Sequence, residues 1–367
     1  MTANRFPAGT KDRWHRERAN VAYKHLAAST MRVIVRDPPI EIPGPEDIVI
    51  DHSASIALVA SQQRMLASGK FLDPHEMPSG SVFGLDLNTE LLVPRLLVDQ
   101  ASLGFPFHPH GCSFFAGKNG ERRLMVISHR SKSDHVVEIF DVVGDTFDTL
   151  RLNHLHTVVD DDHLISPNDV VVLDGERFYV GNDHSARSNL LRSVEDLSGF
   201  PLSTVSFWDG SRGHTVASGI SFANGMALDR ARGRLYVAAT RSKKISVYAW
   251  DAQDPAKWLV ESDSIHLPGC PDNLEWDEEG NLWIEADPSF VQLALYVAGL
   301  HKQAPSQVLC VSFDQQHEPR VEEVWRDETG ETISASSVAA VHGKGKVRRL
   351  LIGQPFGNFV RDCELVA

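Results

Sequence analysis

Short polar clusters recur along this 367-residue chain, and most of their side chains offer oxygen donors. The clusters are Glu46-Asp47, His110, Asn168-Asp169, Asn224, Asp272-Asn273 and Ser336-Ser337. Carboxylate and amide oxygens are the ligands that Ca²⁺ prefers, in sets of roughly six to eight that include water. No cysteine or histidine pair joins the clusters, so they would be a poor ligand set for zinc or copper. These residue types predict a calcium site if the fold brings the clusters together.

Each cluster lies at the start of a repeated unit that predicts β-strands. The unit is a polar cluster, a short apolar strand, a turn and a second apolar strand, and it begins near Pro45, His108, Ser166, Phe222, Pro271 and Ala335. Turn pairs such as DG and NG between the apolar runs are typical of hairpins. Each of the six units is long enough for four strands. The repeat predicts an all-β fold, a six-bladed β-propeller with four-stranded blades and a central calcium site.

The propeller is expected to form one domain over residues 31–367, with residues 1–30 as an N-terminal arm. In a propeller the starts of the innermost strands converge on one mouth of the central channel. We therefore expect the polar clusters to face one another although they are far apart in the sequence. Apolar residues at helical spacing also predict a helix within 186–200, over a connecting loop.

Composition narrows the class of partner. The formal net charge is −13, which disfavours nucleic acid and anionic membranes as partners. No stretch approaches the roughly 20 apolar residues of a membrane helix, and no signal peptide or membrane anchor is evident. The four cysteines are widely spaced, which is typical of free thiols, and a cytoplasmic location is predicted. Nucleotide-binding fingerprints and a serine-hydrolase elbow are also missing from the sequence.

The motifs in their order resemble those of the serum paraoxonase/arylesterase family, which are six-bladed calcium-dependent lactonases and esterases. The resemblance covers about residues 40–367 and rests on PED at Pro45, HPHGCS at His108, SPNDVV at Ser166, YVGNDH at Tyr179, FANG at Phe222 and PDN at Pro271. It implies two Ca²⁺ ions on the propeller axis. The catalytic ion would be held by Glu46, Asn168, Asn224, Asp272 and Asn273. The structural ion would be held by Asp47, Asp169 and the backbone carbonyl of Cys112.

The resemblance further implies a catalytic histidine dyad, His110 with His129, that activates water. A carboxylate of the calcium site, Glu46 or Asp272, is the alternative base, and the sequence leaves this choice open. Asp183 and His184 are expected to support the residues of the site without taking part in the chemistry themselves. The implied substrates are small lactones and aryl or carboxylic esters.

The residues expected to line the substrate pocket are Phe71, Phe107, Phe222, Asp287 and Ser337. Asp287 stands where relatives commonly carry histidine, which adds negative charge near the mouth. Cys363 matches a disulfide cysteine of the relatives, but no cysteine precedes Cys112, so blade closure is expected to rest on strand pairing.

Three other functions are compatible with the sequence. A sugar-lactone hydrolase of the gluconolactonase type would share the propeller and the metal but would have a polar pocket. Chemistry like that of strictosidine synthase is more distant, because it uses a carboxylate and no calcium. A non-catalytic propeller with a structural ion would bind a partner on its face.

Overall fold

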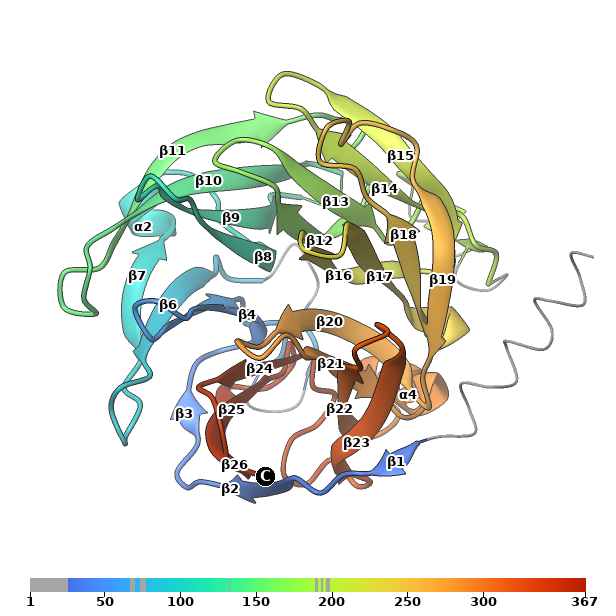
Figure 1. The fold of residues 1–367 in the computed structure, drawn as a ribbon. Coiled ribbons are helices and arrows are strands. Elements are labelled where there is room, and N and C mark those ends of the chain that lie inside the picture. The colour runs from blue at the N-terminus through green and yellow to red at the C-terminus, as the bar shows by residue number, and fades with distance from the viewer. Residues whose placement is uncertain are drawn as a thin grey trace, which may run out of the picture.

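The computed structural model describes residues 26–66, 70–72, 77–131, 133–188, 191–192, 194–195 and 199–367. Most of the predicted N-terminal arm therefore lies outside the described residues, as does part of the helix predicted within 186–200. The described strands form six sheets around a central axis (Figure 1). The prediction of a six-bladed propeller with four-stranded blades is confirmed.

In each of the first three blades, the strands follow one another from the axis outward. Blade 1 contains β4 Pro45–Asp51, β5 Ile56–Ser61, β6 Ser81–Asp86 and β7 Arg95–Asp99. Blade 2 contains β8 Pro109–Ala116, β9 Arg122–His129, β10 His135–Val143 and β11 Arg151–Val159. Blade 3 contains β12 Pro167–Val172, β13 Phe178–Asn182, β14 Ser203–Trp208 and β15 Gly213–Ile220.

Blades 4 and 5 continue the same order. Blade 4 contains β16 Ala223–Asp229, β17 Arg234–Ala239, β18 Lys244–Ala249 and β19 Val260–His266. Blade 5 contains β20 Cys270–Trp276, β21 Leu282–Asp287, β22 Ser306–Phe313 and β23 Pro319–Asp327. Among the described residues, the short helix α2 Gln100–Leu103 follows β7 of blade 1 and α4 Phe290–Val297 follows β21 of blade 5. The 3₁₀ turn η2 spans Thr240–Ser242 in blade 4.

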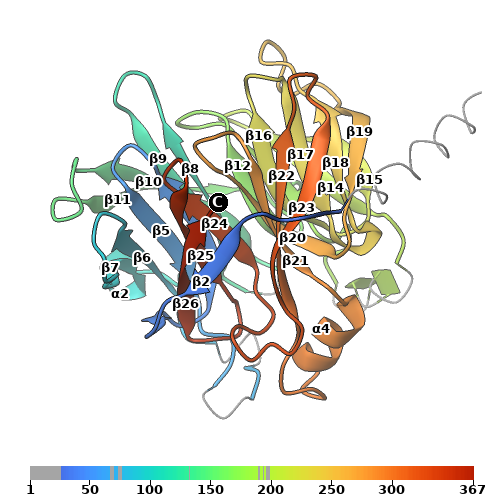
Figure 2. The same ribbon diagram turned by 60° about the horizontal axis from the view of Figure 1, so that its bottom comes forward.

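Blade 6 is completed by the N-terminal part of the chain. It contains β24 Val338–His342, β25 Val347–Gly353 and β26 Phe359–Val366, and β2 Arg32–Val35 pairs with β26 in antiparallel fashion. Figure 2 shows β2 lying beside β26. The short strand β3 Ile40–Glu41 also pairs with β26, and β1 Ala27–Ala28 runs parallel to β23. Cys363 is a free, buried thiol, so strand pairing closes the ring at this blade.

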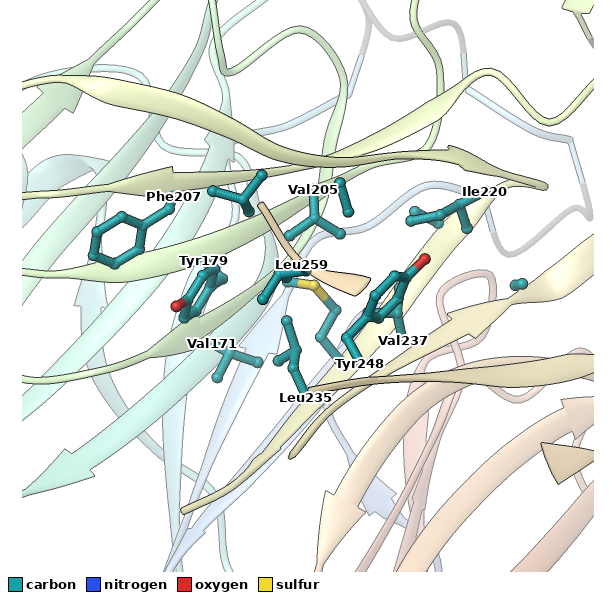
Figure 3. Packing of buried hydrophobic residues seen from close by; sticks show 14 of the residues in the cluster. Val171, Tyr179, Val205, Phe207, Ile220, Leu235, Val237, Tyr248 and Leu259 are labelled. Atoms are coloured by element: carbon teal, nitrogen blue, oxygen red, sulfur yellow. The ribbon is translucent and has the colours of Figure 1, made fainter. Parts of the chain in front are cut away.

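Burial explains why the second strand of each hairpin is so apolar. Strands β5 and β13 are buried along their whole length because neighbouring blades cover both of their faces. The outermost strand β19 is mostly exposed and carries the polar sequence VESDSIH. Figure 3 shows one of the interblade cores, where Tyr179 and Phe207 of blade 3 pack with Leu235 and Tyr248 of blade 4. This layered core holds the innermost strands in place around the channel.

Candidate active site in the central channel

A β-bulge interrupts the innermost strand of five blades at the same place. In blade 1, Pro45 pairs with Ser61 and Asp47 with Ala60, so Glu46 has no partner on β5. The same shift in register leaves out His110-Gly111, Asn168, Asn224-Gly225 and Asp272-Asn273. A bulge turns a side chain away from the face of the sheet to which a regular ladder would direct it. Most residues of the predicted polar clusters are therefore bulged residues. Asp47 and Asp169 instead pair with the next strand, and β24, which follows Ser337, has no such shift.

Two glycines allow the innermost strands to approach each other at the bulges. A Cβ on Gly111 would lie 2.5 Å from the carbonyl oxygen of Asn168, and one on Gly225 would lie 2.4 Å from that of Asp272. Any other residue would force these backbones apart. The glycines that follow His110 and Asn224 in the sequence are thus required by the contact between blades.

Glu46 is buried and makes its closest contact with Arg64. Arg64 Nη1 pairs with Glu46 Oε2, and Arg64 Nη2 lies 2.9 Å from His110 Nδ1. His110 Nε2 lies 3.5 Å from Glu46 Oε1. Burial acts to raise the pKa of Glu46, but the positive charge of Arg64 and the neighbouring His110 outweigh it and lower that pKa. Glu46 is therefore held as a carboxylate.

Three further carboxyl groups lie deeper in the channel. Asp47 Oδ2 accepts a hydrogen bond from Cys112 N at 2.7 Å, and Asp169 Oδ2 accepts one from Met226 N at 2.6 Å. Burial raises the pKa of Asp47 to about 7 and that of Asp169 well above its usual range. Burial and the charges of these two aspartates also raise the pKa of Glu275. A cation among them would relieve this repulsion.

A second carboxyl cluster lies where blade 5 meets the channel. Oxygen atoms of Asp272, Glu285 and Asp287 lie within 4.8 Å of one another. Glu285 Oε1 accepts a hydrogen bond from Ser336 Oγ at 2.6 Å, whereas Glu285 Oε2 and Asp287 Oδ1 are buried with no partner among the described residues. Burial raises the pKa of all three groups well above the usual range, and mutual repulsion adds to the effect at Asp272 and Glu285.

The histidines of blade 2 form a row. The rings of His110 and His129 meet edge to face with centroids 4.9 Å apart, because β8 and β9 are antiparallel neighbours. His129 Nδ1 lies 2.9 Å from His135 Nδ1. Burial lowers the pKa of His110, lowers that of His129 well below its usual range and brings that of His135 to about 4. All three imidazoles are therefore neutral near pH 7.

Asp183 and His184 lie behind Asn168. Asp183 Oδ1 contacts His184 Nδ1 at 2.7 Å and accepts from Ser166 Oγ at 2.5 Å, and Asp183 Oδ2 accepts from Asn168 Nδ2 at 3.4 Å. Burial acts to raise the pKa of Asp183, but these hydrogen bonds, above all that with His184, lower it. The contact orients the Asn168 amide so that its oxygen is left for another partner.

The structure brings some of the expected pocket residues together and moves others elsewhere. Phe71 packs edge to face with Tyr296 of α4 at 5.4 Å and with Phe356 at 5.1 Å, so it belongs to an apolar aromatic group. Phe222 lies 5.5 Å from the ring of His184, beside the site.

Phe107 and Ser337 do not serve as exposed pocket residues. Phe107 is fully buried in the core between blades 1 and 2 and packs against Phe140. Ser337 is also fully buried, and its Oγ donates a hydrogen bond to the carbonyl oxygen of Glu46 at 2.6 Å. Ser337 thus positions the backbone that carries Glu46. The expectation that these two residues line the pocket is corrected.

Sequence reasoning missed four residues of the site: Arg64, His135, Glu275 and Glu285. Arg64 and His135 follow strand hairpins and carry no repeat signal. Glu275 lies on an innermost strand, three residues after the bulged Asp272. Glu285 lies opposite the bulge of β20, and its position in the buried run LWIEAD was the available signal, since a charged residue there needs a partner.

Comparisons with known proteins identify the family. The sequence profile of the arylesterase family matches residues 71–365. Human serum paraoxonase/arylesterase 1 is 32% identical over 296 residues, which cover 78% of this chain and 77% of the relative. Human serum paraoxonase/lactonase 3 is 30% identical over 333 residues, covering 88% and 86%. The chain belongs to the serum paraoxonase/arylesterase family, as the motifs predicted.

A solved structure of a luciferin-regenerating enzyme shares the fold. It aligns with a TM-score of 0.54 at 12% identity, over 92% of this chain and 95% of that one. At this identity the likeness concerns the fold alone. Within the described part of the chain, no helix has the length and apolar character to cross a membrane. The names of the relatives refer to serum, which does not support the predicted cytoplasmic location.

Proposed function

We propose that this protein is a calcium-dependent hydrolase of lactones and of aryl and other carboxylic esters. The observation that carries the proposal is the set of aligned bulges, which turn oxygen donors of four innermost strands toward one channel. The family membership supports hydrolysis of ester or lactone bonds in small molecules.

The donor chemistry fits Ca²⁺. The ligands of the first ion would be Glu46, Asn168, Asn224, Asp272 and Asn273, and those of the second Asp47, Asp169 and the carbonyl of Cys112. Asn224 donates a hydrogen bond to Asp272, while its own oxygen Oδ1 is buried with no partner among the described residues. A buried oxygen that has no hydrogen-bond partner and lies among carboxyl groups of raised pKa is the feature expected of a site that binds a cation. Glu46 fits less completely, because Arg64 already engages its Oε2.

When bound, Ca²⁺ would supply Lewis-acid polarisation of the substrate carbonyl. The residues of the chain would activate and orient water. In this proposal His110 accepts a proton from the attacking water while the water oxygen bonds to the carbonyl carbon. The bond from the carbonyl carbon to the ester oxygen then breaks, and the proton passes from His110 to the leaving alkoxide oxygen. An ester gives a carboxylic acid and an alcohol, and a lactone gives one hydroxy acid.

Arg64 constrains which nitrogen of His110 takes this role. Because Arg64 has only donors, its contact with His110 Nδ1 makes Nδ1 the acceptor and puts the proton of the neutral ring on Nε2. His110 Nδ1 can therefore take up a proton only after Arg64 has moved away from this nitrogen. His129 packs against His110 and receives support from His135, so the row can hold the ring in place. Glu46 or Asp272 remains the alternative base.

The first experiment is hydrolysis of a substrate panel by the purified protein with Ca²⁺ and with a chelator. The panel contains an aliphatic lactone, a sugar lactone, phenyl acetate and an aryl phosphotriester. We expect turnover of the aliphatic lactone and phenyl acetate that the chelator abolishes and Ca²⁺ restores. Turnover of the sugar lactone alone would favour the gluconolactonase type. If calcium binds to the folded protein but no substrate turns over, a structural ion in a partner-binding propeller would replace our proposal.

A further inference from the structure

Three metal-ligating side chains converge at the other end of the central channel. His52 follows β4, Glu278 lies in the turn between β20 and β21, and His342 ends β24. His52 Nδ1 lies 3.7 Å and His342 Nδ1 lies 4.0 Å from the same oxygen, Glu278 Oε2. One ligand atom from each residue fits within a span of 4.8 Å.

The Nδ1 lone pairs of the two histidines have no hydrogen-bond partner in the described structure. Both of these atoms, Nδ1 of His52 and Nδ1 of His342, are buried. Nδ1 is the nitrogen of His52 directed at Glu278, and the backbone of Trp276 also interacts with the His52 ring. Such a backbone contact is the usual way in which a metal-binding imidazole is oriented.

We propose that His52, Glu278 and His342 form a binding site for a divalent transition-metal ion of the Zn²⁺ class. Two imidazoles and one carboxylate are a ligand set that Zn²⁺ accepts and that Ca²⁺ does not favour. Metal–ligand bonds of zinc length place tetrahedral ligand atoms about 3.3 Å apart, a little closer than the two distances observed. The side chains are 17–27% exposed, so a water molecule can complete the coordination.

The surroundings modulate the site. Glu278 Oε2 accepts a hydrogen bond from Gly343 N at 3.2 Å, and Lys344 Nζ lies 3.5 Å from Glu278 Oε1. Burial lowers the pKa of both histidines, so each presents a neutral ring near pH 7. The rings of His52 and His342 are stacked with their centroids 5.8 Å apart, and because both rings are neutral they do not repel each other. Lys344 opposes a bound cation, because it adds positive charge beside the carboxylate.

A metal here would join blades 5, 6 and 1. Blade 6 is the blade that β2 completes by strand pairing, and blades 5 and 1 lie on either side of it. A cavity of about 310 Å³ reaches from Asp169 and Glu275 to His52, so the proposed site borders the channel at the end away from Glu46. The bound metal ion would hold these three blades together and would take no part in hydrolysis.

The test is titration of the full-length protein with Zn²⁺ by calorimetry, with saturating Ca²⁺ present to occupy the oxygen-donor sites. We expect one Zn²⁺ per chain, and Co²⁺ in its place should show the visible absorption of a tetrahedral site. His52→Gln, His342→Gln and Glu278→Gln should each weaken binding by at least about a hundredfold. Lys344→Gln should strengthen binding by about two- to fivefold, since an exposed opposing charge is removed.

His301→Gln is the matched control, because His301 is exposed and lies in another loop; its Zn²⁺ affinity should equal that of the wild type. The proposal is overturned if the wild type binds no Zn²⁺, or if the three ligand variants bind it as tightly as the control. It is also overturned if Asp272→Asn, rather than these variants, removes the bound Zn²⁺. None of these readouts depends on hydrolysis, so failure of the proposed enzyme function would leave this test intact.

Discussion

The two ends of the central channel use the same innermost strands to present different sets of donor atoms. Strand β4 places Glu46 at one end of the channel and His52 just beyond the other end. The segment around β20 places Asp272 and Glu278 in the same way, and the segment around β24 places Ser337 and His342. Five or six positions along a strand separate the two members of each pair, which corresponds to about 16–20 Å. One end gathers buried carboxylates and amides, and the other gathers half-buried imidazoles around one carboxylate.

The difference shows how the propeller separates donor types. At the first end, bulges turn consecutive polar residues inward, so the charges accumulate out of water and the pKa values of most of the carboxyl groups rise. At the second end the strands simply stop, and hairpin residues meet at the rim. In our proposals a cation balances the charge of the first end, whereas the second end is neutral enough to persist without one. The following predictions test this contrast.

The largest effect should come from calcium removal at different pH values. A carboxyl whose folded pKa is raised binds more protons in the folded state, so the stability of the metal-free protein falls as pH rises above about 4. For Asp47 alone, the rise to about 7 corresponds to a loss on the order of 4 kcal/mol by pH 8.

Thermal unfolding with chelator and with Ca²⁺ measures this effect. We expect the stabilisation by Ca²⁺ to be much larger at pH 8 than at pH 5. Addition of Zn²⁺ to the Ca²⁺-loaded protein should change the midpoint far less. Equal calcium effects at the two pH values would argue against a charged, metal-dependent first end.

The next largest effect should come from His110. We expect His110→Gln to lower kcat/KM for the preferred lactone by about 10²- to 10⁴-fold while the protein stays folded, since a proton acceptor is lost. His52→Gln, a change of the same kind at the other end, should leave kcat/KM within about twofold. An unchanged rate in His110→Gln would assign water activation to Glu46 or Asp272.

A third prediction concerns the carboxyl cluster of blade 5. The double substitution Glu285→Gln and Asp287→Asn removes two buried acids, each with one oxygen that has no hydrogen-bond partner among the described residues. The chelated protein should therefore gain about 2 kcal/mol of stability at pH 8. The same substitution should weaken Ca²⁺ binding, because negative charge beside Asp272 is lost. Urea unfolding and calcium titration report these opposite changes. If the chelated variant is less stable than the wild type, the cluster is held by contacts other than a cation.

The smallest effect should come from Ser337. Ser337→Ala removes the hydrogen bond to the Glu46 carbonyl, and we expect a loss of about 1 kcal/mol in the free energy of unfolding. The ranking of substrates should not change, because the side chain is fully buried. A changed ranking with unaltered stability would restore Ser337 to the pocket wall.

The sequence by itself determined the six repeats and the types of donor they carry. Polar residues at one position of every unit predicted a shared site, and the family motifs pointed to the class of chemistry. The apolar hairpins predicted blades because each strand pair must be buried between two neighbours. These properties are local or periodic, so they can be recognised without coordinates.

Only the tertiary structure decided what each donor contacts. The pairing of Arg64 with Glu46, the row from His110 through His129 to His135, and the core position of Phe107 depend on packing between elements. The convergence of His52 with Glu278 and His342 brings together three separate turns that carry no common motif. Periodicity places residues on a strand, but bulges, close approach of backbones and burial decide which way their side chains turn and which charges must share one space.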